Sequence, residues 1–319
     1  MYQLPDLIGD ASLLASQTQA PRVLRTADGR WMVHAHAKLN LGLRVFPARP
    51  DGFHDLETWM APISWHDTLW VDDSGEGTPL TLEVTGRAAG VPVEIDKNLV
   101  GCAATKLAAA AGFTPRGKII LHKVLPPGGG IGGGSSDAAS ALVALNQAWN
   151  LHWDDAQLEA LAGEIGSDVP FFVAAHSSLC TGRGEIMTPL RMAQPLFAVL
   201  VIPPQGCPTK DVYQAFDAGH QHQPPREKTN WHQCAHAPAG ELAELLVNDL
   251  EPAAFAVAPW LNDLRRQAAT ALGRPVHMTG SGSTLFTLCS SGQEAETLHA
   301  RLSAALACVC VPVRILRQR

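Results

Sequence analysis

The sequence has few charged residues and no excess of positive ones. Only 17% of its 319 residues are charged, against about a quarter in an average soluble protein. Lysine and arginine together number 24 and aspartate and glutamate 30, which gives a formal net charge of −6. Nucleic acids and anionic membranes attract clustered positive charge, so this chain is a poor candidate for binding either. A small anion could still be bound, because backbone N–H groups hold anions without any net positive charge.

Paired cysteines and long apolar stretches are also missing. None of the seven cysteines belongs to a Cys-x-x-Cys pair, which argues against a disulfide framework and against a zinc ribbon. The N-terminal residues show no basic stretch followed by an apolar one, so no secretory signal is indicated. No apolar run approaches the roughly 18 residues of a membrane span. With 46% hydrophobic residues for a sizeable core, the chain is expected to be a soluble enzyme of the reducing cytoplasm.

The first strong pattern begins at Trp31. Residues 1–30 show little periodicity apart from a short helix predicted over Leu7–Ala15, and we interpret them as an N-terminal extension. From Trp31 to Val45 every odd position is apolar, whereas the even positions include Lys38 and Asn40. This period of two predicts a long strand with one buried face. Lys38 and Asn40 are expected to point the same way from its other face.

The rest of the chain mixes strands and helices without a strict βαβ alternation. Asn98 is expected to cap one helix, and Asp154 with Gln157 to form a capping box on another. Residues 219–240, rich in histidine, glutamine and proline, are expected to form a surface loop. The pattern predicts an α+β fold of two domains, residues 31–185 and 186–319. Strands are expected near residues 68–71, 80–84, 118–125, 196–202, 276–278, 285–288 and 309–315, and helices near residues 99–111, 138–149, 158–165, 241–246, 259–272 and 294–305.

The densest glycine cluster lies between a predicted strand and a predicted helix. Residues 128–136 comprise six glycines, Ile131 and two serines. Such a run lets the backbone adopt positive φ angles and approach a ligand closely. Its free N–H groups and the dipole of the following helix favour a phosphate. A flexible linker is the alternative, but the flanking strand and helix are the context of a phosphate-binding loop.

The type of phosphate loop is less certain from the glycines alone. The G-x-x-x-x-G-K-[ST] signature of a Walker loop is absent. Gly128, Gly130 and Gly133 match the dinucleotide fingerprint G-x-G-x-x-G, but a run of six glycines matches it almost automatically. The loop also lies in mid-chain rather than in a first βαβ unit. A dinucleotide-dependent oxidoreductase stays open as an alternative. A second cluster, Gly280–Ser283, could flank the same phosphates.

Five segments, in one order along the chain, resemble the GHMP kinases, named after galactokinase and the homoserine, mevalonate and phosphomevalonate kinases. Residues 37–43 with 51–56 resemble their first motif, residues 126–139 their phosphate loop and residues 278–286 their third motif. Residues 166–172 and 248–251 resemble one branch of the family. The similarity covers residues 31 to about 316. It implies a two-domain GHMP-kinase-like α+β fold, with the nucleotide site in the cleft between the domains.

The activity implied by this resemblance is transfer of a phosphoryl group from ATP, with Mg²⁺, to the 2-hydroxyl of a cytidine-diphosphate-linked methylerythritol. Lys38 and Asp168 match the family's catalytic pair. Asp168 would accept the proton of the substrate hydroxyl. Lys38 would keep that carboxylate ionised and offset charge on the transferred phosphoryl group. The alternative is a surface lysine at position 38 and a helix-capping aspartate at position 168. Without the resemblance, Asp168 would be interpreted as a capping or turn residue.

The resemblance also assigns the nucleotide-binding residues. Asn98 would lie near the adenine and Lys123 near the nucleotide, and Ser136 is the expected contact of Mg²⁺. The remaining ATP-binding residues would come from the two glycine clusters: Pro126, Pro127, Gly128, Gly129, Gly130, Ile131, Gly132, Gly133, Gly134, Ser135, Ser136, Gly280, Ser281 and Gly282.

The residues expected to bind the second substrate come from separate parts of the chain. Asn40 would lie near the reacting end, and His54 would contact the cytosine edge. Phe53 and Tyr213 would stack on the base, and Thr209 matches a threonine of a substrate loop. The family usually has tyrosine where this chain has Phe53, so the stacking face is retained and the hydroxyl is lost.

Two further alternatives concern the substrate and the activity. A GHMP kinase for another small alcohol, such as homoserine or mevalonate, is disfavoured by Phe53–His54 and by residues 166–172. A non-catalytic nucleotide binder of the same fold is disfavoured by the presence of both Lys38 and Asp168. We expect the chain to bind a small molecule rather than nucleic acid or membrane, as a monomer or a homodimer.

Overall fold

The fold was analysed in a computed structural model that describes residues 23–73, 78–220 and 229–317. The helix expected over Leu7–Ala15 lies outside these residues. Part of the predicted extension is ordered, because β1 (Val23–Arg25) pairs with the strand that follows it. Residues 23–25 therefore belong to the main sheet.

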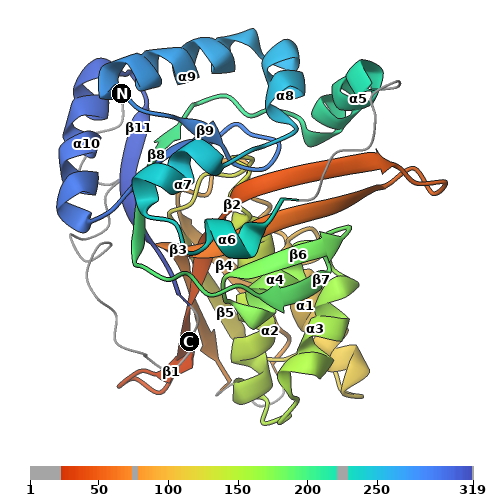
Figure 1. The fold of residues 1–319 in the computed structure, drawn as a ribbon. Coiled ribbons are helices and arrows are strands. Elements are labelled where there is room, and N and C mark those ends of the chain that lie inside the picture. The colour runs from red at the N-terminus through yellow and green to blue at the C-terminus, as the bar shows by residue number, and fades with distance from the viewer. Residues whose placement is uncertain (1–22, 74–77, 221–228, 318–319) are drawn as a thin grey trace.

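Two long strands form the centre of the molecule (Figure 1). β2 (Trp31–Ala48) and β3 (His54–Asp72) are antiparallel partners over most of their length. β5 (Lys118–Lys123) pairs with the second half of β3, and β4 (Thr81–Gly86) runs parallel to β5. β6 (Ser178–Gly182) pairs with the first half of β3 and with β7 (Ile186–Pro189). The hairpin of β2 and β3 thus carries the whole N-terminal part of the sheet.

Four helices cover one face of this part of the sheet. They are α1 (Leu99–Ala110), α2 (Gly133–Ala148), α3 (Asp155–Gly163) and α4 (Val169–Ala174). α2 is the most buried of them and packs against both β2 and β3. Its apolar side chains join those of α1, β3 and β5 in one core cluster. The expected cap of α1 by Asn98 and the capping box of Asp154 and Gln157 are both confirmed.

The C-terminal part continues the same sheet in the order β3, β11, β8, β10, β9. β11 (Val309–Ile315) and β10 (Leu285–Cys289) flank β8 (Leu196–Ile202), and β9 (His277–Met278) forms the edge. The helices of this part are α5 (Thr209–His220), α6 (Trp231–Cys234), α7 (Ala239–Leu245), α8 (Glu251–Val257), α9 (Pro259–Leu272) and α10 (Gly292–Ala305). In Figure 1 α5, α8 and α9 lie above the β2–β3 hairpin, and the four N-terminal helices lie below it.

A central core cluster connects the two parts of the fold. Two predictions about this central region are wrong. Trp231, in the expected surface loop, is only 1% exposed and packs against Gly42 of β2. Lys38 and Asn40 were expected on an open face of β2, yet they are 5% and 6% exposed. The glycine loop and the C-terminal part cover that face, so the middle of β2 is buried on both sides. The α+β fold is confirmed, and the domain boundary near residue 185 stays a prediction.

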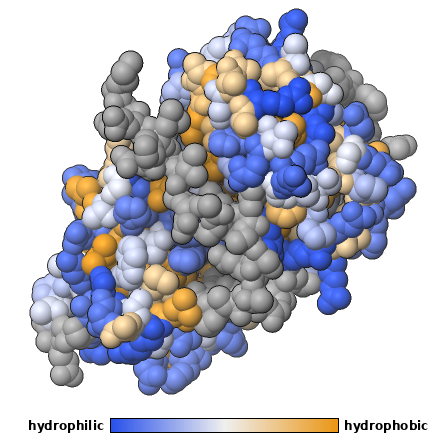
Figure 2. All heavy atoms as spheres, turned by 90° about the vertical axis from the view of Figure 1, so that its left-hand side faces the viewer, coloured by the Kyte–Doolittle hydropathy of each residue, from blue (hydrophilic) through white to orange (hydrophobic). Residues whose placement is uncertain are grey.

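Hydrophilic residues make up much of the described surface on the side shown in Figure 2, with apolar residues in smaller groups between them. In the described part of the chain, no helix combines the length and the apolar character that a bilayer crossing requires.

Candidate active site

A cavity of about 1140 Å³ lies where β2, the glycine loop, α4 and α5 meet. Its wall includes almost every residue that the sequence assigned to a site, although these residues come from segments as far apart as positions 38 and 281. The exceptions are Ser136 and Gly282. The fold thus brings the five motifs into one place.

The glycine loop needs glycine at alternate positions. Gly128, Gly130 and Gly132 have φ angles of +76°, +74° and +74°, a region that other L-residues rarely adopt. At Gly132 a Cβ atom would also lie 2.6 Å from the Cζ of Phe172. The loop is therefore tightly shaped by its surroundings, and the flexible-linker interpretation is wrong.

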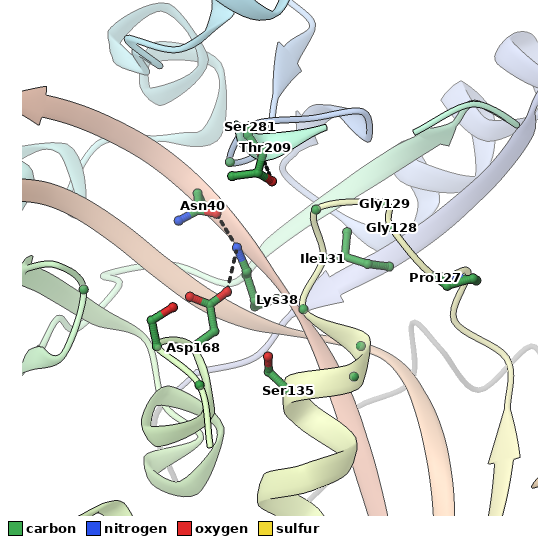
Figure 3. A pocket seen from close by; sticks show the side chains of 18 of the residues that line it. Lys38, Asn40, Pro127, Gly128, Gly129, Ile131, Ser135, Asp168, Thr209 and Ser281 are labelled. Carbon is green, nitrogen blue, oxygen red and sulfur yellow. Dashed lines mark hydrogen bonds and ion pairs between the residues drawn. The ribbon is translucent and has the colours of Figure 1, made fainter. Parts of the chain in front are cut away.

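The loop ends at the N-terminus of α2. Gly132 is the residue before the helix, and it has no side chain to cap the first N–H groups. Helix termini leave these N–H groups without intrahelical partners, and the helix dipole adds partial positive charge there. In Figure 3 Ser135 lies in the first turn of α2, and it lines the cavity together with Lys38 and Asp168. This end of the cavity has the features of a phosphate site.

Ser136 does not face this site. It is 1% exposed, and its hydroxyl donates a 2.7 Å hydrogen bond to the carbonyl of His36 on β2. The hydroxyl thus ties α2 to the sheet, and the structure does not support the expected Mg²⁺ contact. Ser135, the preceding residue, lines the cavity instead. The sequence could not separate the two serines, because neighbouring residues at a helix start differ only in the side they face.

Lys38 and Asp168 meet in the middle of the cavity (Figure 3). The Nζ of Lys38 lies 3.9 Å from an Oδ of Asp168 and donates a hydrogen bond to the Oδ1 of Asn40. The Nδ2 of Asn40 donates in turn to the hydroxyl of Thr58 at 2.8 Å, and that hydroxyl donates to the carbonyl of Gly42. This chain fixes the lysine. Thr58 was missed by the sequence analysis, because it lies on a different strand with no motif of its own.

Asp168 stands at the start of α4 but does not cap it. Among the described residues its side chain makes no capping hydrogen bond, and 42% of that side chain is exposed. The carboxylate is directed toward Lys38 and the cavity. Its negative charge, together with burial as the main cause, raises the pKa of Tyr213 to about 12. The phenol therefore stays neutral near neutral pH.

The second glycine cluster closes the cavity from the C-terminal part. Asn248 holds it, because its Nδ2 donates to the carbonyls of Met278 and Gly280 at 2.8 Å each. The hydroxyls of Thr209 and Ser281 are 2.8 Å apart and link the start of α5 to this loop. A Cβ atom on Gly282 would meet the Sδ of Met278 at 2.9 Å, so that position faces the packed interior and not the cavity.

Part of the cavity wall comes from the segment before α1 and from the first residue of that helix. Val91, Pro92 and Leu99 are its apolar residues, and Asn98 lines the cavity with them. Both ends of the Asn98 amide bond within the protein: its Oδ1 accepts from Val100 N at 2.9 Å, and its Nδ2 donates to the carbonyl of Pro92 at 2.7 Å. Asn98 therefore shapes this wall through the cap of α1.

A buried charge cluster lies behind the phosphate end. The Nζ of Lys123 contacts the carboxylates of Asp67 and Asp137, the latter at 2.6 Å. Asp67 also accepts from the N–H groups of Val124 and Leu125, whereas Asp137 Oδ1 has no partner among the described residues. Burial, together with the charge of Asp67, raises the pKa of Asp137 to about 8. Lys123 lines the cavity, and its expected place near the nucleotide stays a prediction. Both carboxylates were missed as its partners.

Another part of the cavity wall is aromatic. Phe53 is 54% exposed, and the guanidinium carbon of Arg183 lies 4.8 Å from the centre of its ring. Tyr213 of α5 packs against His54, with ring centres 5.4 Å apart. His54 is buried, and its Nε2 lies 3.2 Å from the carboxylate of Asp217. Arg183 and Asp217 also line the cavity and were not among the predicted site residues.

The comparisons with known proteins agree with this geometry. The model of the GHMP kinases N terminal domain matches residues 98–176, and that of the GHMP kinases C terminal matches residues 232–308. A 4-diphosphocytidyl-2-C-methyl-D-erythritol kinase from Nocardia farcinica is 38% identical over 279 residues, which cover 86% of this chain and 90% of the relative. Another from Pelotomaculum thermopropionicum is also 38% identical, over 84% of this chain and 92% of the relative.

Solved structures show the same relationship. The crystal structure of a 4-(cytidine 5'-diphospho)-2C-methyl-D-erythritol kinase matches with a TM-score of 0.73 and 33% identity, over 89% of this chain and 98% of that one. A homoserine kinase from Cytophaga hutchinsonii matches with a TM-score of 0.67 and 16% identity, over 93% and 98%, and shares the fold. The glycine loop thus belongs to a kinase, and the oxidoreductase alternative is wrong. The chain belongs to the GHMP kinases and, within them, to the family of the 4-diphosphocytidyl-2-C-methyl-D-erythritol kinases.

Proposed function

We propose that this chain transfers the γ-phosphoryl group of ATP to the 2-hydroxyl of 4-diphosphocytidyl-2-C-methyl-D-erythritol, in the non-mevalonate route to isoprenoid precursors. The observation that carries the proposal is the meeting of Lys38 and Asp168 beside the glycine loop and the N-terminus of α2. A phosphate-binding loop and a carboxylate that can accept a proton then face the same space. The identity to kinases with this name supports the choice of substrate.

The reaction needs positioning and charge more than covalent help. The glycine loop and the first N–H groups of α2 bind the phosphates, which fixes the γ-phosphorus in front of Asp168. The carboxylate of Asp168 takes the proton of the attacking hydroxyl as the new O–P bond forms. Lys38, held by Asn40 and Thr58, offsets negative charge on the transferred group. The bond between the γ-phosphorus and the bridging oxygen breaks, and ADP leaves with that oxygen.

Mg²⁺ fits the donor atoms at this place. Mg²⁺ prefers oxygen ligands, usually one or two from the protein together with the phosphates and water. Ser135 and Asp168 offer a hydroxyl and a carboxylate at the cavity wall, and Asp137 Oδ1 is a buried oxygen without a partner among the described residues. We propose that Ser135 and Asp168 are the residues that would hold the ion. When bound, the ion would neutralise charge on the β- and γ-phosphates.

Two parts of the cavity wall fit the two substrates. The apolar segment before α1 would take the adenine of ATP. The aromatic part would take the cytosine, with Phe53 as a stacking face that needs no hydroxyl. Asn40 would lie near the reacting alcohol, and Thr209 beside the linking diphosphate. We further propose that the chain works in the cytoplasm, as a monomer or a homodimer.

The direct test is product formation from the purified chain. With MgATP and 4-diphosphocytidyl-2-C-methyl-D-erythritol, we expect one ADP and one phosphate monoester per turnover, seen by a coupled ADP assay and by ³¹P NMR. Homoserine and mevalonate serve as the competing alcohols. If either of them yields ADP and the cytidine-linked alcohol does not, the kinase fold stands and the substrate proposal is wrong.

A further inference from the structure

The carboxylate of Asp67 continues a strand pairing at the point where the backbone pairing stops. The register of β3 and β5 ends at Thr68 and His122, so Asp67 is the next residue of β3 along that edge. Its Oδ1 accepts from the N–H groups of Val124 and Leu125, at 2.5 and 2.8 Å. At these two residues the chain leaves β5 and runs into the glycine loop. One side-chain oxygen thus fixes the entry of the loop.

The other oxygen of this carboxylate reaches the exit of the loop through Lys123. The Nζ of Lys123 donates to the Oδ2 of Asp67 and, at 2.6 Å, to the Oδ2 of Asp137 in α2. Entry and exit lie side by side, because a Cβ atom on Gly133, the first residue of α2, would lie 3.4 Å from the Cβ of Leu125 and 3.7 Å from the Nζ of Lys123. The bridge Asp67–Lys123–Asp137 therefore closes the loop at its base.

Sheet packing alone does not call for this bridge. The three residues are at most 4% exposed. Removing their charges from water carries a large desolvation penalty, and apolar side chains of similar size often stabilise a fold as well. An apolar side chain, however, offers no acceptor to the N–H groups at the loop entry. The loop has glycines with positive φ angles at alternate positions, and such a backbone has little rigidity of its own. A directional anchor at its base supplies that rigidity.

We propose that Asp67 is a positioning residue for the phosphates of ATP, which acts by holding both ends of the glycine loop. Asp67 is fully buried behind the cavity wall, so it acts through the loop and not by contact with the nucleotide. The N–H groups of the loop and of α2 thereby keep their direction toward the phosphates. The inference rests on the proposed function and deepens it, because it names a residue of the ATP site that lies in none of the five motifs.

The test separates binding of the phosphates from binding of the nucleoside. Dissociation constants for MgATP and for adenosine are measured by calorimetry without the alcohol, that of adenosine through its displacement of ATP. Asparagine has one acceptor oxygen, so in Asp67→Asn it can serve the two N–H groups or Lys123 but not both. We expect the Kd for ATP to rise about tenfold, as for a displaced binding group, and the Kd for adenosine to stay within about twofold.

The matched control is Asp249→Asn. Asp249 is also buried, and its two oxygens accept from the N–H of Val45 and from the guanidinium of Arg44, at 3.1 Å each. It thus reproduces a buried aspartate between a backbone N–H and a cation, but at a position outside the cavity wall. The control should lose stability in a urea titration, yet keep the wild-type ratio of the Kd for adenosine to the Kd for ATP.

A second variant covers the case in which Asp67→Asn alone does not fold. The triple variant Asp67→Asn, Lys123→Met and Asp137→Asn leaves no unpaired charge of the bridge, and such replacements are often neutral for stability. It should fold and show the same rise in the Kd for ATP without a rise for adenosine. If neither variant folds, the bridge serves the fold itself and the proposal is overturned.

Three results with a folded variant would also overturn the proposal. Asp67→Asn could keep the wild-type ratio of the two dissociation constants, it could weaken ATP and adenosine equally, or Asp249→Asn could change the ratio to the same extent. Turnover of the cytidine-linked alcohol by wild type is measured separately. A wild type that binds ATP but does not phosphorylate the alcohol would contradict the proposed function and leave the role of Asp67 standing.

Discussion

The backbone N–H of Lys38 donates a 2.9 Å hydrogen bond to the carbonyl oxygen of Ile131. This bond joins the middle of β2 to the glycine loop, so the lysine and the phosphate site are parts of one rigid unit. The next residue of the loop, Gly132, is so close to β2 that a Cβ atom there would lie 3.3 Å from the Cγ of Lys38. Charge stabilisation depends on such preorganised distances.

Gly132→Ala should damage both the fold and nucleotide binding. The φ angle of +74° and the 2.6 Å approach to Phe172 each oppose a Cβ atom. We expect a loss of about 2–4 kcal/mol in the free energy of unfolding, measured by urea titration, and at least about a tenfold weaker Kd for ATP, since the loop must shift. Gly134→Ala is the control. Its Cβ would lie 3.5 Å from the Cδ1 of Leu99, which is an ordinary contact. Since the position is helical, the Gly134→Ala variant should be at least as stable as wild type. Equal stability of the two variants would contradict the account.

Thr58→Val should slow phosphoryl transfer without weakening the binding of ATP. The change removes the acceptor of the Asn40 amide and the donor to the carbonyl of Gly42, both buried. Asn40 would then no longer fix Lys38, and we expect kcat to fall about tenfold, the effect of a misplaced catalytic group, with KM for ATP nearly unchanged. Thr58→Ser keeps the hydroxyl and should restore most of kcat. If the serine variant is as slow as the valine variant, packing and not the hydrogen bond matters.

Asp137→Asn should change how stability depends on pH. The folded-state pKa of Asp137 is raised to about 8 by burial and by Asp67, whereas an unfolded aspartate has a pKa of about 3.9. Between these values Asp137 is protonated in the folded chain and ionised in the unfolded chain, so its contribution to the free energy of unfolding falls as pH rises from about 4 to 8. Asparagine does not titrate, so the variant does not lose stability in this way. Its stability relative to wild type should therefore increase from pH 5 to pH 9 in thermal unfolding, and a constant or decreasing difference would contradict the assignment.

Local signals in the sequence predicted much of the fold. The strand at residues 309–315, the cap by Asn98 and the capping box at Asp154 depend on neighbouring residues, and the structure confirms them. The glycine loop was equally clear, because six glycines between a strand and a helix leave few other interpretations. The motif order then placed Lys38 and Asp168 together, which alternation along one strand could not do.

Features set by distant contacts were missed. Strand β3 runs over His54–Asp72, but only its end was predicted, because its middle is buried on both faces and shows no alternation. The helix over Thr209–His220 was not expected either. The buried ring of Trp231 depends on Gly42, far away in sequence, because a Cβ atom there would collide with it. Asp67, Asp137 and Asp217 depend in the same way on partners that fold beside them.

The most direct test of the account is single-turnover phosphoryl transfer by Asp168→Asn. The proposed base lies 3.9 Å from Lys38, and asparagine keeps its size while removing its ability to accept the proton. With saturating MgATP and the cytidine-linked alcohol, the account predicts a rate about 10²–10⁴-fold below wild type, the usual loss for a general base. Asp211→Asn removes a charge from an exposed position of α5 outside the cavity and should react at the wild-type rate. A rate for Asp168→Asn within about tenfold of wild type would contradict the role of Asp168 as the base.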